Sequence, residues 1–157
     1  MIQTIINEST PLTSNSSPIV FDTTNIRTRC AFCCNNGWLD FENGNPIFKI
    51  FGNNYNGYYN ANFTATVSSA TAGVVAIGLY EDGVLIPDTV RAVTLDAADD
   101  FETISINRKL RICPRGTSSL TIQSVPVVPT PTDPTTPITT QTPIIVAATF
   151  NLSRTNN

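Results

Sequence analysis

The sequence has no histidine, and this absence excludes most ordinary catalytic sites. Neither a Ser-His-Asp triad nor a Cys-His pair can be built, and the commonest zinc ligand is missing. Among the remaining residues we find no acid-base pair and no nucleophile with a neighbouring base. We therefore expect a protein that is not an enzyme and that carries no cofactor and no metal ion.

Charge is also scarce. Only 13% of the 157 residues are charged, against roughly 25% in an average domain, and the net charge is -3. Such a chain has no strong positive field to gather nucleic acid or an anionic membrane, so we expect neither as a partner. Uncharged polar residues must cover the surface instead, and the chain has 23 Thr, 16 Asn and 11 Ser for this purpose.

No apolar run approaches the roughly 18 residues that a membrane span requires. The first residues, MIQTIINESTPLTSNSS, lack the charged and apolar segments of a signal peptide. We expect a soluble protein made in the cytosol. The length suits one domain with a sizeable core.

The four cysteines, Cys30, Cys33, Cys34 and Cys113, form one cluster and one distant member. A structural zinc site normally uses two paired clusters, and Cys113 stands alone. A disulfide from Cys30 or Cys34 to Cys113 requires two strands to meet there. Zinc and a disulfide stay open as alternatives, but a cytosolic product favours reduced, buried thiols.

Residues 1–29 hold short apolar islands in a Ser/Thr/Asn background without helical periodicity. Such a segment cannot bury itself, so it must dock on its own body or on a partner. We interpret it as an extended N-terminal arm. Its candidate partner contacts are Ile2, Ile5, Ile6, Ile19, Val20 and Phe21.

Residues 30–157 are predicted to form an all-β domain. Residues 59–67 alternate between apolar and polar side chains, which is typical of a strand with one buried face. Asp82-Gly83 lies between two apolar runs, as in a tight hairpin. Eight or more short strands and no convincing helix indicate a sandwich or barrel of the jelly-roll or Ig-like kind.

A Pro/Thr-rich insertion at residues 125–143 contains six of the eleven prolines and cannot join a central strand. It is either a projecting loop that binds a partner or a solvated linker. Apolar residues on both strand faces at 74–79 and 144–148 indicate burial on both sides, as in an oligomer.

The stretch GYYNANFTATVSSATAGVVAIGLYEDGVLIPDTV at 57–90, with VFDTTNIRTRC before it, resembles the trimeric C1q/TNF-like jelly rolls of head-fibre and auxiliary capsid proteins of tailed bacteriophages. It is also similar to the C-terminal domains of collagen-like spore-surface proteins, but the chain has no Gly-x-y tract. The resemblance covers residues 18–124 and 143–153. It implies a homotrimeric jelly roll at a virion surface.

Two clusters of charge are candidate binding sites. Arg108, Lys109, Arg111 and Arg115 form a basic cluster that either docks on an acidic partner or protects a strand edge from aggregation. In an extended strand Lys109 and Arg111 share one face. Asp96, Asp99, Asp100 and Glu102 form an acidic turn that lacks the order of an EF-hand, so a solvated loop is favoured over a calcium site.

Seven of the thirteen aromatic residues lie between positions 38 and 59. They could stack on sugars, but a core or a subunit interface is the commoner use. The members are Trp38, Phe41, Phe48, Phe51, Tyr55, Tyr58 and Tyr59.

These observations predict a structural virion protein, either a capsid decoration or a head-fibre component. It would be made in the host cytoplasm and would bind the major capsid protein or another virion protein through its arm and its basic cluster. The alternative is a receptor- or glycan-binding module that uses the aromatic region on a phage fibre or a bacterial surface.

Overall fold

The computed structural model describes residues 1–6, 8–12, 16–27, 39–52, 57–113, 115–126 and 140–155. Within these ranges every regular element is a β-strand, apart from the short 3-10 turn η2 (Pro87–Thr89). None of the described residues forms a helix that is long and apolar enough to cross a bilayer. The prediction of an all-β jelly-roll sandwich is confirmed.

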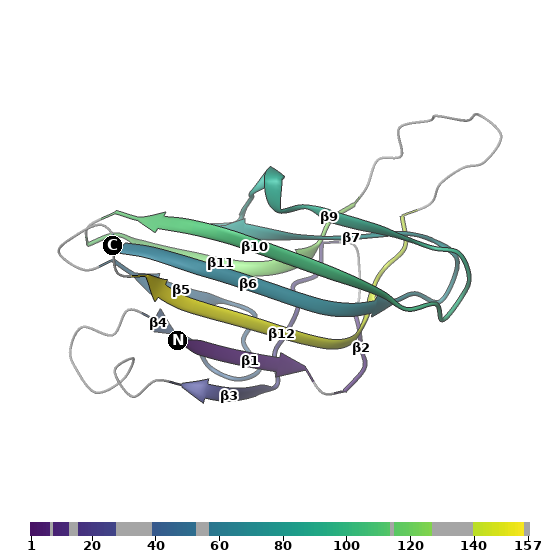
Figure 1. The fold of residues 1–157 in the computed structure, drawn as a ribbon, viewed down its shortest axis with the longest axis horizontal. Coiled ribbons are helices and arrows are strands. Elements are labelled where there is room, and N and C mark those ends of the chain that lie inside the picture. Colours follow the sequence, from purple (N-terminus) through teal and green to yellow (C-terminus); the bar gives the residue numbers. More distant parts are fainter. Residues whose placement is uncertain are drawn as a thin grey trace.

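Two antiparallel sheets pack face to face (Figure 1). Sheet A runs in the order β10 (Glu102–Ile112), β6 (Gly57–Ser68), β12 (Ile144–Thr155), β1 (Ile2–Ile6) and β3 (Thr23–Arg27), and β2 (Thr10–Pro11) pairs with the start of β12. Sheet B runs in the order β4 (Leu39–Asp40), β5 (Phe48–Phe51), β11 (Thr117–Ser124), β7 (Gly73–Glu81) and β8 (Val84–Leu85), and β9 (Arg91–Leu95) also pairs with β7.

Alternating side chains on the long strands build the core. On β6 the apolar residues of the 59–67 pattern point inward and are at most 1% exposed, whereas the Asn and Thr residues between them point out of the sandwich. At the centre, the Phe48 ring lies 5.7 Å from Phe21 and 4.7 Å from Phe150. Phe48 lies in sheet B, Phe150 lies in sheet A and Phe21 lies in the segment that connects them, so the rings join the two sheets.

The hairpin predicted at Asp82-Gly83 is present. Glu81 pairs with Val84, and the two turn residues have φ angles of 51° and 79°. Two consecutive positive φ values give the turn a twist that matches the strands it connects.

The N-terminal segment is part of the sandwich and is not a separate arm. Strand β1 lies between β12 and β3 in sheet A. The chain then crosses to sheet B, where the N–H of Ile19 donates to the carbonyl of Ile122, and returns to sheet A as β3. Residues 1–27 therefore connect the two sheets.

This corrects the prediction of partner contacts in the segment. Ile2, Ile6, Ile19 and Phe21 are at most 2% exposed and belong to the protein's own core. Residues with so little exposed surface cannot contact a partner while the fold is intact. Val20 is half-buried, and so is Ile5, which lies on the outer face of sheet A.

The structure also corrects the argument for an oligomer from strand β7. Ala76 and Gly78 point away from the core but are still buried, because the chain folds back over them. Leu85, Val90 and Val125 would meet any side chain added at Gly78. On β12 the apolar run at 144–148 contains a register shift between Ile145 and Ala147, which disrupts the alternation.

The Pro/Thr-rich insertion is fixed at both bases. The N–H of Val125 donates to the carbonyl of Ala76, and the N–H of Gln141 donates to the carbonyl of Val74. Residues 127–139 lie outside the described residues.

Candidate functional site

The outer face of sheet A presents a row of amide side chains. Gln3 lies opposite Asn151, Asn151 opposite Asn62, and Asn62 opposite Asn107, so the row crosses the neighbouring strands β1, β12, β6 and β10. All four residues occupy outward positions, because the alternate residues of each strand fill the core. Neighbouring strands are about 4.8 Å apart, so adjacent amides are close enough to share hydrogen-bond partners.

A row of hydroxyl groups lies beside the amides. Thr149 is opposite Thr64, and Thr64 is opposite Ser105. The Thr64 Oγ1 and Ser105 Oγ atoms are 3.4 Å apart. We call these two rows together the amide face; none of their residues carries a charge.

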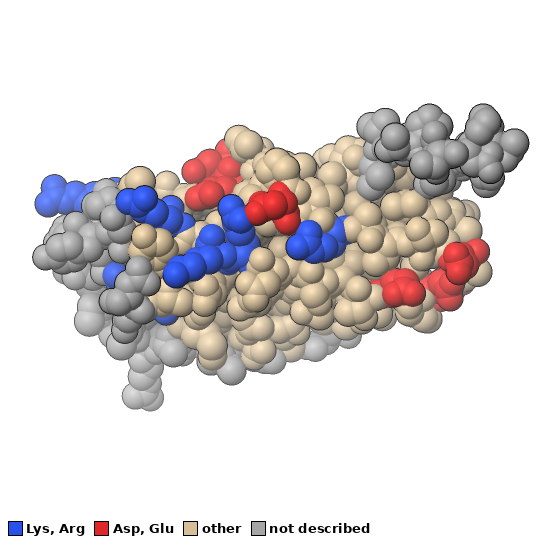
Figure 2. Space-filling model, turned by 45° about the horizontal axis from the view of Figure 1, so that its top comes forward, with Lys and Arg blue, Asp and Glu red and all other residues tan. Residues whose placement is uncertain are grey.

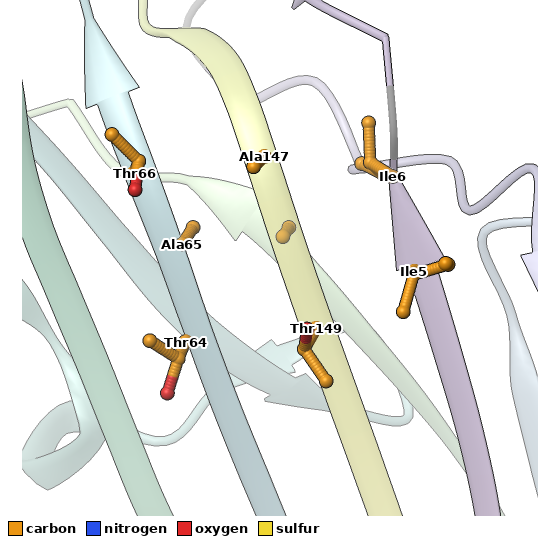
Figure 3. A pocket seen from close by; sticks show the side chains of 8 residues that line it. Ile5, Ile6, Thr64, Ala65, Thr66, Ala147 and Thr149 are labelled. Carbon is orange, nitrogen blue, oxygen red and sulfur yellow. The ribbon is translucent and has the colours of Figure 1, made fainter. Parts of the chain in front are cut away.

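A shallow hollow of about 260 Å³ lies on this face (Figure 3). Ile5 and Thr149 border it, together with Thr64, Thr66 and Ala147. Small side chains on β12 and β6 leave the space open, and Ile5 supplies an apolar wall. The lining has methyl and hydroxyl groups, which suit van der Waals contact and hydrogen bonding.

The basic cluster divides between the two faces of β10. Lys109 and Arg111 point outward and are exposed, which confirms that they share a face. Arg108 occupies an inward position between Ile106 and Leu110 at the edge of the sandwich. It forms an ion pair with Asp88 in η2, and both side chains are substantially exposed. Arg115 lies in the turn after β10 with a φ of 57°.

The described members of the aromatic region are mostly buried, as the favoured interpretation of core packing predicts. Phe41, Phe48 and Tyr59 are in the core. Tyr58 and Phe51 are half-buried, and the Lys109 ammonium lies 4.8 Å from the centre of the Tyr58 ring. Trp38 and Tyr55 lie outside the described residues.

The remaining candidate ligands are not brought together. Cys113 is exposed and is not in a disulfide with any described residue. Cys30, Cys33 and Cys34 lie outside the described residues. The acidic turn is exposed to solvent, and no group of three or more metal-ligating residues forms in the described part of the chain.

Sequence comparison gives no relative: no protein-family profile matches, and no curated protein does. Among solved structures, the globular domain of zebrafish complement 1qA protein is 14% identical, with a TM-score of 0.51 over 97% of this chain and 94% of that chain. The C-terminal domain of EclA, a sugar-binding protein, is 11% identical with a TM-score of 0.36 over 98% of this chain and 76% of that chain. A family 35 carbohydrate-binding module from Clostridium thermocellum is 10% identical with a TM-score of 0.33 over 94% of this chain and 90% of that chain.

The C1q likeness agrees with the resemblance found in the sequence and shows the jelly-roll fold. The other two structures are too distant to carry an argument. Nothing in these comparisons points to a bacteriophage protein.

Proposed function

We propose that the protein is a non-catalytic structural component that assembles into a homotrimer through the amide face. The in-register amide row supports this proposal most directly. Each amide both donates and accepts hydrogen bonds, so the same face of three copies can meet around a three-fold axis without any charge to neutralise. The number three rests on the resemblance of residues 57–90 to trimeric jelly rolls.

The trimer is tested by light scattering at about 0.5 M salt, where contacts between exposed charges are screened. We expect a mass three times the 17.0 kDa of the chain. Asn151→Lys should give monomers, because it places an ammonium group at the centre of the amide face. Thr94→Lys, on an exposed position of β9 in the other sheet, is the matched control and should leave the trimer intact. A monomeric wild-type protein at micromolar concentration would remove the trimer proposal.

The site of action that we propose is a virion surface, as a capsid decoration or a head-fibre component. Support comes from the resemblance of residues 57–90 and from a surface made of uncharged polar residues. Because the N-terminal segment is part of the sandwich, the capsid contact must come from another surface. Purified particles should carry the protein in a fixed, high copy number on heads.

Binding of a neutral glycan is the second candidate function, and the same amide row favours it. Amides hydrogen-bond well to sugar hydroxyls. Assembly into a trimer and glycan binding would both use the amide face, so the oligomeric state and the glycan affinity together distinguish them. A monomer whose glycan affinity is lost in Asn151→Lys would support recognition and contradict assembly through this face.

A further inference from the structure

Charge is separated along strand β10. The strand begins at Glu102, directly after Asp96, Asp99 and Asp100, and Lys109 and Arg111 lie near its other end. Lys109 and Arg111 follow Glu102 by seven and nine residues, which at about 3.3 Å per residue places them roughly 23 and 30 Å from it. Figure 2 shows Lys and Arg, with some Asp and Glu among them, over one half of the molecule, and a separate group of Asp and Glu at the opposite end. We name the four carboxylates the acidic tip and the pair Lys109 and Arg111 the basic end.

The two groups cannot neutralise each other within one molecule. Their separation is several times the screening length of about 8 Å at physiological salt. In the described part of the chain, none of the six side chains belongs to an ion pair, and Arg108 pairs with Asp88. Both groups are therefore left with charge that an external partner can meet.

An exposed aromatic residue lies in the acidic tip. Phe101, between Asp100 and Glu102, is 62% exposed, and the carboxylates around it are exposed as well. The loop has a defined shape, because the N–H of Asp99 donates to the carbonyl of Ser69 and the N–H of Asp100 donates to the carbonyl of Ala97. Aromatic residues are enriched in protein contact surfaces, and the rim around them is polar.

The basic end also combines charge with an aromatic side chain, as the acidic tip does. Lys109 lies over the half-buried ring of Tyr58, so cationic and aromatic surface occur together. Acidic residues of sheet B at this end of the molecule are engaged locally: Ser118 donates to Glu81 at 2.8 Å, and the N–H of Ser119 donates to Asp82 at 2.7 Å. The basic side chains are thus available to carboxylates from outside.

We propose that the basic end of one copy binds the acidic tip of a second copy, head to tail, with Phe101 placed against the surface around Tyr58. The two surfaces differ, so the contact is heterologous and repeats from copy to copy. It would link molecules end to end into rows. The contact goes beyond the proposed trimer and does not depend on it.

Two charge-reversal variants test this contact by sedimentation velocity. Asp96→Lys/Asp100→Lys/Glu102→Lys changes the formal charge of the tip from -4 to +2, and Lys109→Glu/Arg111→Glu makes the basic end acidic. Asp99 is left unchanged because its φ of 60° suits Asp better than Lys. We expect the mass of the wild-type protein to be higher at low salt than at about 0.5 M salt and to rise further with protein concentration, as rows require. Each variant alone should lose this increase.

The decisive experiment is to mix the two variants. Their reversed ends are again complementary, so an equimolar mixture should recover the low-salt association. Asp22→Lys/Glu42→Lys and Lys49→Glu, at exposed positions elsewhere, are the matched controls and should associate like the wild type. If the mixture does not associate, or the wild type shows no salt-dependent growth, the contact is wrong. The mass at about 0.5 M salt reports the trimer separately.

Discussion

The hydroxyl of Thr89 accepts a hydrogen bond from the backbone N–H of Leu79 at 3.0 Å. It also donates to the carbonyl of Ile86 at 2.7 Å, and the residue is 2% exposed. One side chain thus fixes η2 to the middle of β7. This position keeps Val90 over the outer face of sheet B, where it helps to bury Gly78.

Thr89→Val should therefore destabilise the protein, because the side chain keeps its shape but leaves the Leu79 N–H buried without an acceptor. We expect the free energy of unfolding to fall by about 1–3 kcal/mol, measured by urea denaturation. Thr89→Ser keeps the hydroxyl and should lose less. Equal stability of the valine and wild-type proteins would show that the hydrogen bond contributes nothing.

Ile6→Ala and Ile5→Ala compare neighbouring residues on opposite faces of β1. Ile6 is 2% exposed and packs in the core, so its truncation should cost about 2–5 kcal/mol. Ile5 is half-buried on the outer face, so its truncation should lower the free energy of unfolding of the isolated chain clearly less. Chemical denaturation measures the free energy of unfolding of both variants. If neither substitution changes it, the N-terminal segment is a detachable arm and not part of the sandwich.

Gly83→Ala should destabilise the β7–β8 hairpin. Gly83 has a φ of 79°, and an L-residue in the left-handed region costs roughly 1–2 kcal/mol. Gly83→Asn should cost less, because Asn tolerates this region better than Ala. Thermal melting of the pair measures the difference, and an alanine variant as stable as the asparagine variant would contradict the turn geometry.

Stability should fall in strongly alkaline solution because of Tyr59. Burial raises the pKa of this phenol above its ordinary value near 10, and Arg154 opposes the shift in part. Since the unfolded chain ionises first, the stabilisation is fully present below about pH 10 and is lost as the pH rises through the folded-state pKa. The guanidinium midpoint should fall between about pH 9 and about pH 11, and fall less steeply in Tyr59→Phe. Parallel curves for the two proteins would assign the loss to other groups.

The sequence allowed the strands to be predicted where the residue pattern is local. Alternation from Tyr59 to Val67 identifies a strand and its buried face, and Asp82-Gly83 identifies a turn, because both signals depend on neighbours in the chain. The amide row could not be predicted in this way. Asn62 was visibly on an outer face, but its position opposite Asn151 and Asn107 depends on strand order and register, which alternation does not determine.

The N-terminal segment shows a second limit. Isolated apolar residues such as Ile2, Ile6 and Ile19 must be buried somewhere, and the same pattern suits the protein's own body or a partner. The apolar residues on both faces of β7 indicate an oligomer for a related reason, although the cover comes from the same chain. Gly78 is covered by Leu85, Val90 and Val125, which lie seven or more positions away in the chain, so the pattern of β7 alone does not show what covers it.

The pairing of β1 with β12 sets the order in which the protein can fold. Ile2 lies opposite Leu152, so β1 cannot pair with β12 until residues near the end of this sequence have been synthesised. Sheet A is complete only after this pairing. During synthesis on a ribosome the apolar side chains of β1 stay exposed until β12 has emerged. Such distant pairing slows folding and exposes the chain to aggregation. Completion of the sandwich is thus a late, cooperative step. A chain truncated within β12 should aggregate, because no smaller part of it forms a stable domain.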